Sequence, residues 1–103
     1  MEQTSDSALQ AEAMISVRNL RVSYGKQEIL HGISFDVMRG ETLVVLGGSG
    51  SGKSTLLRTL VGLEKPSSGE IFLSGKNIAA ISDAEMDEIW GLVTDGTAVE
   101  IYA

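Results

Sequence analysis

Residues 47–55 of the chain read Gly47-Gly48-Ser49-Gly50-Ser51-Gly52-Lys53-Ser54-Thr55. This stretch has the complete form G-x-x-x-x-G-K-S/T of a phosphate-binding loop. Its glycines allow the backbone to turn tightly, so that successive N–H groups point at phosphate oxygens. Lys53 can reach the β- and γ-phosphates of a nucleotide, and the hydroxyl of Ser54 can bind Mg²⁺. The pattern therefore predicts a site for a nucleoside triphosphate.

The residues on both sides of the loop supply the structural context that such a loop needs. Residues 42–46 form a short, β-branched apolar run, which is typical of a parallel strand buried on both faces. Apolar residues then recur at helical spacing from Leu56 to Leu63, and Gly62 with Pro66 ends the helix. A Gly/Ser-rich linker lacks this frame. We therefore predict a strand, the loop and a helix, within an α/β fold.

The remaining chain predicts further strands around this unit. Before the loop we expect strands at 14–22, 28–30 and 33–37. After the loop's helix we expect a strand at 70–74 and a short extended piece at 77–79. Residues 1–13 are polar and are predicted to form a disordered tail.

The sequence of the last quarter of the chain predicts one helix, and a less regular pattern after it suggests one hairpin. Ser82 followed by Glu85 has the pattern of a capping box and marks a helix start. Met86, Ile89 and Trp90 would form the apolar face of this helix. Residues 91–102 could form a hairpin around Asp95-Gly96.

Composition narrows the class of protein. The chain has 103 residues, enough for one small domain or a piece of a larger one, and a formal charge of −6 without a basic cluster. A nucleic-acid partner is therefore not expected. The absence of cysteine excludes a disulfide framework. No apolar run approaches the roughly 20 residues that span a bilayer, and residues 1–6 do not form a secretory signal. If the protein serves a membrane, we expect a peripheral subunit.

Shorter motifs accompany the phosphate loop in a definite order. They are Tyr24-Gly25, Ile33–Val37, Gly40-Glu41, Leu56-Leu57-Arg58, Gly62-Leu63, Pro66–Ile71 and Gly75. As a set, over about residues 14–90, they resemble the N-terminal part of an ATP-binding cassette, the ATPase subunit of ABC transporters. Residues 81–88 also resemble, weakly, the cassettes of Mce/Mla-type lipid transporters.

The resemblance implies a P-loop NTPase fold that is incomplete in this chain. It would consist of an antiparallel β subdomain, residues 14–38 and 70–79, beside the first strand, phosphate loop and helix of the core. Such a half-core leaves apolar surface without its partners, so we predict marginal stability or self-association. Residues 14–90 would form the partial nucleotide-binding domain, and residues 91–103 a divergent C-terminal tail.

The resemblance also implies ligands and partners. Tyr24 matches the family's A-loop aromatic, which stacks on adenine, and an aromatic ring suits a base physically. The loop residues Gly47 to Thr55 would bind ATP, with Mg²⁺ at Ser54. Expected partners are transmembrane permease subunits and a second ATP-binding subunit, which places the chain on the cytoplasmic face of a membrane.

Several of the family's hydrolytic motifs have no counterpart in this sequence. No glutamine follows Gln27, the Leu-Ser-Gly-Gly-Gln signature is missing, and no apolar run after the loop ends in Asp-Glu. Residues 73–76 imitate the start of the signature but lie where the family has a strand and a turn. His31 precedes the loop and is interpreted as a turn or strand-edge histidine. We therefore assign no catalytic residue in this chain.

Three functions remain open from the sequence. The first is an ATP-binding subunit, or a truncated fragment of one, that energises membrane transport. The second is a non-catalytic nucleotide-binding module or a remnant without function. A small P-loop kinase is the third, and it is disfavoured because Arg58 is the only arginine after the loop.

Overall fold

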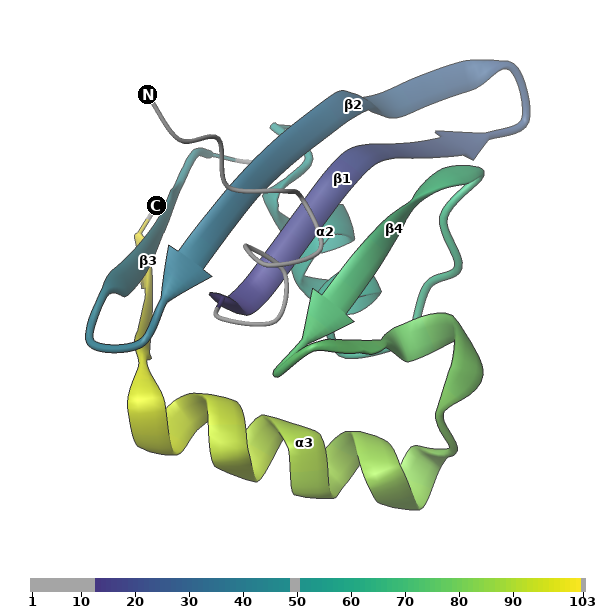
Figure 1. Cartoon of the computed structure of the whole chain (residues 1–103). Helices are drawn as coiled ribbons and strands as arrows, with labels where there is room; N and C mark the ends of the chain where they lie inside the picture. The colour runs from purple at the N-terminus through teal and green to yellow at the C-terminus, as the bar shows by residue number, and fades with distance from the viewer. Residues whose placement is uncertain (1–12, 49–50, 103) are drawn as a thin grey trace, which may run out of the picture.

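The computed structural model describes residues 13–48 and 51–102, which form two small sheets and two α-helices (Figure 1). The N-terminal residues 1–12, and with them nearly all of the expected polar tail, lie outside the described residues. In chain order the elements are β1 (Ala13–Tyr24), β2 (Gln27–Met38), β3 (Thr42–Leu46), α2 (Lys53–Leu60), β4 (Ser68–Leu73), β5 (Lys76–Asn77), the 3₁₀-helix η1 (Ile78–Ala80), α3 (Asp83–Gly96) and β6 (Ala98–Tyr102).

The larger sheet confirms the predicted antiparallel β subdomain. Its four strands lie in the order β2-β1-β4-β5, and both neighbours of β1 run antiparallel to it. Ile15, Val17, Leu20 and Val22 of β1 are all buried. The spacing changes between Val17 and Leu20 because the register shifts there and Asn19 adopts a φ of 49°. The bulge thus keeps the apolar residues of β1 on the core side.

Strand β2 is continuous, so the prediction of two separate strands at 28–30 and 33–37 was wrong. Gly32 lies in its middle with a φ of 90°, and a Cβ there would approach Nη2 of Arg21 to 3.1 Å. Glycine accommodates this conformation and the close arginine without breaking the strand. The pairing with β1 therefore runs from Met38 back to Gln27.

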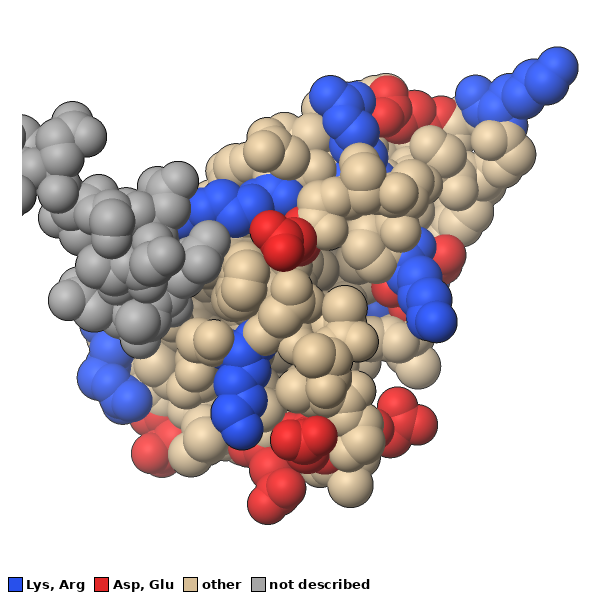
Figure 2. Space-filling model, turned by 45° about the vertical axis from the view of Figure 1, so that its right-hand side comes forward, with Lys and Arg blue, Asp and Glu red and all other residues tan. Residues whose placement is uncertain are grey.

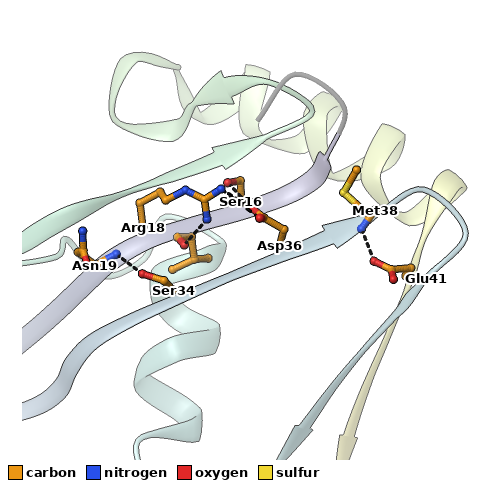
Figure 3. Close-up of polar contacts among 8 residues, drawn as sticks. Ser16, Arg18, Asn19, Ser34, Asp36, Met38 and Glu41 are labelled. Atoms are coloured by element: carbon orange, nitrogen blue, oxygen red, sulfur yellow. Dashed lines mark hydrogen bonds and ion pairs between the residues drawn. The ribbon is translucent and has the colours of Figure 1, made fainter. Parts of the chain in front are cut away.

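Polar side chains join β1 to β2 along part of the hairpin (Figure 3). Nη2 of Arg18 lies 2.9 Å from Oδ1 of Asp36, and the Ser16 hydroxyl donates to the same oxygen at 2.7 Å. Burial raises the pKa of Asp36, but the hydrogen bonds from Arg18 and Ser16 outweigh it and leave the pKa below its ordinary value. Beyond the hairpin, at the end of β2, the Met38 N–H donates at 2.7 Å to the carboxylate of Glu41 in the turn to β3.

The predicted strand–loop–helix unit is present, with a shorter helix than expected. α2 ends at Leu60, although the apolar pattern continues to Leu63, because the backbone turns at Gly62 with a φ of 85°. The N–H of Leu63 then donates to the carbonyl of Arg58 at 2.8 Å. The chain reaches β4 through the Pro66 loop, as predicted.

Helix α3 confirms the capping box but extends beyond its predicted end. The N–H of Glu85 donates to the Ser82 hydroxyl at 3.2 Å, and the Glu85 carboxylate accepts from the Ser82 N–H. Ile89 and Val93 are buried, and Nε1 of Trp90 donates to the Leu60 carbonyl of α2 at 3.1 Å. The apolar face therefore packs inward from Met86 to Val93.

The hairpin predicted for residues 91–102 was wrong. α3 continues through Asp95 to Gly96, and the following strand β6 pairs in parallel with β3. The Gly96 carbonyl accepts a hydrogen bond from the Gly40 N–H at 2.7 Å, and the Ala98 N–H donates to the Glu41 carbonyl. Tertiary contacts with the β2–β3 turn thus override the local turn signal of Asp95-Gly96.

One face of the β3–β6 sheet is open, so the prediction that β3 is buried on both faces was wrong. Val45 is buried and Leu43 packs against the core, but Val44 and Leu46 are 46% and 69% exposed. Tyr102 of β6, the partner of Leu46 in the register, is 50% exposed.

Within the described part of the chain, no helix has the length and apolar character to cross a membrane.

Candidate phosphate-binding site

The loop begins with a close approach that only glycine permits. Gly47 has a φ of 144°, and a Cβ there would lie 2.9 Å from Cβ of Ser51 and still closer to its hydroxyl oxygen. Ser51 in turn donates through its hydroxyl to the Gly48 carbonyl at 2.8 Å. The first and fifth positions of the loop thus lie close together. In phosphate-binding loops, a tight turn of this kind directs backbone N–H groups into a concave nest that suits an anion.

The N-terminus of α2 adds helix amide groups to this nest. Its N-cap residue, Gly52, has a left-handed conformation with a φ of 90°, and no side chain among the described residues caps the helix. A Cβ on Gly52 would lie 3.1 Å from Cδ2 of Leu30, so β2 supports the loop from behind. Uncapped N–H groups and the positive end of the helix dipole both favour a bound phosphate.

A cavity of about 270 Å³ opens beside this turn. Its lining, as far as the chain is described, comes from β2, the loop and the start of α2: Gln27, Ile29, Gly48, Gly52, Lys53, Ser54 and Thr55. The Ser54 side chain is exposed at the cavity, whereas Thr55 is buried. Ser49 and Gly50, also predicted to bind the nucleotide, lie outside the described residues.

Lys53 contacts the end of β6. Its Nζ atom donates to the main-chain carbonyl oxygen of Tyr102 at 3.0 Å. Tyr102 pairs with Leu46, the last residue of β3, so β6 ends beside the start of the phosphate loop. The hydroxyl of Tyr102 donates to the Glu100 carboxylate at 2.7 Å, which raises the pKa of Tyr102.

Tyr24 lies next to α2 and forms a polar cluster there. Its hydroxyl donates to the Glu64 carboxylate and accepts from Nη2 of Arg58, both at 2.9 Å. The same oxygen is 3.5 Å from Oγ1 of Thr55. The structure thus brings Tyr24 to the helix that carries the loop, although it is not among the described residues that line the cavity. Its stacking on a base stays a prediction.

The sequence did not point to three residues of this region. Gln27 and Ile29 line the cavity. They follow the tight turn that pairs Gln27 with Tyr24, so recognising this hairpin in the sequence could have placed both residues near Tyr24. No local signal could have placed Tyr102, because its position depends on the parallel pairing of β6 with β3.

Two motifs outside the loop lie where the sequence suggested. His31 is on β2, an edge strand of the larger sheet, with its Nδ1 atom 3.0 Å from the Glu28 carboxylate. Residues 73–76 form the end of β4 and the turn into β5.

Figure 2 shows Lys and Arg side chains scattered over one face without a continuous basic patch.

Comparison with known proteins identifies the family to which this chain belongs. The model of the family described as "ABC transporter" matches residues 30–100. An sn-glycerol-3-phosphate import ATP-binding protein of Rhizobium johnstonii is 44% identical over 73 residues, which cover 71% of this chain and 20% of the relative. An Fe(3+) ions import ATP-binding protein of Haemophilus influenzae is 49% identical over 65 residues, which cover 63% of this chain and 18% of the relative.

Similarity to solved structures points to the same family. A bacterial Atm1-family ABC exporter with ATP bound superimposes with a TM-score of 0.67 and 34% identity, over 74% of this chain and 14% of that one. The chain spans 16–24% of the length of the curated relatives it matches. Because the family model covers most of the chain, from β2 to β6, the chain belongs to the ABC transporter family, and it matches part of the length of that family's ATP-binding proteins.

Proposed function

We propose that the chain is part of the ATP-binding subunit of an ABC transporter and binds Mg–ATP at its phosphate loop. The observation that carries this is the turn at Gly47, which has no room for a Cβ, beside the uncapped N-terminus of α2. A backbone nest and a helix N-terminus that meet at one point suit a polyphosphate. The names of the relatives support ATP as the nucleotide.

Each residue of the site has a defined task in this function. The N–H groups of Gly52, Lys53 and Ser54 would hold phosphate oxygens, and the ammonium of Lys53 would neutralise part of their charge. The exposed hydroxyl of Ser54 would hold Mg²⁺ together with phosphate oxygens and water, which suits an ion that prefers oxygen ligands. Tyr24 would stack on the adenine.

Transport would require more than this chain's own site. We propose transmembrane permease subunits and a second ATP-binding subunit as partners, on the cytoplasmic face of a membrane. The cargo is not assigned, because the two relatives above carry different cargoes in their names, a sugar-alcohol phosphate and a metal ion. Residues 14–90 as the nucleotide-binding part, and the Mce/Mla likeness, stay predictions.

A non-catalytic nucleotide-binding module is the second candidate. It is suggested by the cavity, whose described lining residues offer groups for phosphates and Mg²⁺ but include no carboxylate. Phosphoryl transfer to water needs a group that positions the water as well as a clamp on the phosphates. The two candidates differ in turnover once the proposed partner subunits are present: only the first then gives phosphate release that rises with protein concentration and stops in a Lys53→Ala variant.

Calorimetric titration with Mg–ATP tests the proposed function. The whole chain should bind, and Lys53→Ala should weaken binding at least about tenfold, because a charge-assisted contact is lost. Lys76→Ala, at an exposed lysine of β5, is the matched control and should bind like the parent. No heat of binding for the parent, or equal losses for the two variants, would reject the phosphate loop as the site.

A further inference from the structure

The contact between Lys53 and Tyr102 joins the phosphate loop to the C-terminal strand. The two residues are 49 positions apart, yet Nζ of Lys53 donates to the Tyr102 carbonyl oxygen at 3.0 Å. Lys53 is the first residue of α2, so its stem starts at the floor of the nest and its ammonium is the mobile part. In this structure β6 therefore determines where the charge of Lys53 lies.

The contact links a residue that lines the cavity to one outside its described lining. Lys53 contributes to the cavity lining, whereas Tyr102, which accepts the hydrogen bond, is not among the described lining residues. The ammonium thus leans toward the end of β6, beside the last pair of the parallel ladder, Leu46 with Tyr102. A carbonyl oxygen and a phosphate oxygen compete for the same three donors of an ammonium.

We propose that the end of β6 acts as an autoinhibitory contact, in which the Tyr102 carbonyl occupies the Lys53 ammonium until a triphosphate displaces it. This inference rests on the proposed function, because it concerns the same lysine. When a binding group is free in only a fraction of the molecules, the apparent affinity falls by that fraction. Nucleotides whose β- and γ-phosphates replace the Tyr102 carbonyl as acceptors for the Lys53 ammonium would still bind. Their affinity would be lower than that of a protein in which Lys53 is free.

Such a contact would be suitable for regulation if β6 can leave the sheet. β6 pairs only with β3 in the described sheet, and its Tyr102 and Ile101 side chains are about half exposed. A strand held on one side only leaves and returns more easily than a central strand. A partner that pairs with β6 or displaces it would therefore release Lys53 and raise the affinity for nucleotide.

The experiment changes the end of the chain without changing Lys53. Three proteins made by peptide ligation are compared with the whole chain: one ending at Tyr102 as an amide, one ending at Tyr102 as a free carboxylate, and one ending at Ile101 as an amide. The first keeps the accepting carbonyl, the second makes the acceptor anionic, and the third removes it. Circular dichroism verifies that each chain is folded.

Two measurements follow for each protein. Calorimetry gives the Kd for Mg–ATP, and the rate of Lys53 acetylation by acetic anhydride, read by mass spectrometry without nucleotide, reports whether the ammonium is held. We expect the Tyr102 amide to match the whole chain. The Ile101 amide should bind ATP roughly three- to tenfold more tightly and be acetylated faster, and the Tyr102 carboxylate should change both quantities in the opposite direction.

The outcomes separate the two proposals. If the whole chain binds Mg–ATP but the Ile101 amide binds equally or more weakly, the autoinhibitory contact is rejected and the proposed function stands. If the whole chain does not bind, both are rejected. Should the Ile101 amide fail to fold, the two Tyr102 proteins decide, because equal acetylation rates and equal Kd values would show that the carbonyl does not hold Lys53.

Discussion

A Cβ on Gly47 would lie 2.9 Å from the Cβ of Ser51, which brings the first and fifth residues of the phosphate loop into contact. Real Cβ atoms do not approach this closely, and the φ of 144° at Gly47 is one that L-residues avoid. The geometry of the nest therefore depends on the absence of a side chain at position 47.

Gly47→Ala is predicted to abolish nucleotide binding. The new methyl group would force the turn open and add backbone strain of about 1–3 kcal/mol. Gly48→Ala is the control for folding, because a Cβ there has open space and Gly48 has no positive φ. Titration with Mg–ATP and urea unfolding check both. Adding Ser51→Gly to Gly47→Ala should restore part of the binding, and a Gly47→Ala protein that binds like the parent would contradict this account.

The hydroxyl and the ring of Tyr24 are predicted to have separate roles. Tyr24→Phe removes the hydrogen bonds to Glu64 and Arg58 but keeps an aromatic face, so the Kd for ATP should stay within about twofold of the parent. Tyr24→Ala should weaken ATP roughly tenfold and leave inorganic triphosphate unaffected. Fluorescence titration with both ligands checks this. Equal losses for the two ligands would show that Tyr24 acts on the loop and not on the base.

The stability contributed by Asp36 is predicted to depend on pH. Its pKa is lowered in the folded chain from the ordinary value of 3.8, so the contribution is present above that value and is lost as the pH falls through the folded pKa. Asp36→Asn should cost about 1 kcal/mol at pH 7 and progressively less as the pH falls below 3.8. Urea unfolding at several pH values measures this. A cost that does not change with pH would exclude the ion pair with Arg18 as its cause.

The capping box of α3 is predicted to contribute measurably to stability. Ser82→Ala removes the acceptor for the Glu85 N–H and should cost about 1 kcal/mol in the free energy of unfolding. Ser82→Gly should cost only a few tenths of that amount. The order of the two variants in chemical denaturation is the decisive result, since a reversed order would mean that the hydrogen bond is not formed in solution.

The open face of the β3–β6 sheet is predicted to cause self-association. Val44, Leu46 and Tyr102 are exposed on it, and an unpartnered parallel sheet is prone to pair with another copy. Leu46→Thr should shift sedimentation velocity profiles toward the monomer. Leu63→Thr, at an even more exposed leucine in the loop after α2, is the control and should leave the profile unchanged. A parent chain that is monomeric at all concentrations would contradict the prediction.

The sequence predicted most elements because their signals are local. The phosphate loop, the alternation in β1 and the capping box at Ser82 each depend on a few neighbouring residues. It failed where a local signal competes with distant contacts. Asp95-Gly96 has the composition of a hairpin turn, yet Val93 is buried and the Gly96 carbonyl bonds to Gly40, so the helix continues.

What the sequence determined by itself is the local chemistry: the G-x-x-x-x-G-K-S loop from Gly47 to Ser54 and the amphipathic patterns around it, whose meaning depends on residue type and spacing alone. What only the tertiary structure decided is which distant groups face that loop. Gln27 and Ile29 enter the cavity through the tight turn between β1 and β2, which is a local feature, but Tyr102 reaches Lys53 only because β6 pairs in parallel with β3. Pairing between strands far apart in the chain is set by long-range packing, which leaves no local pattern in the sequence.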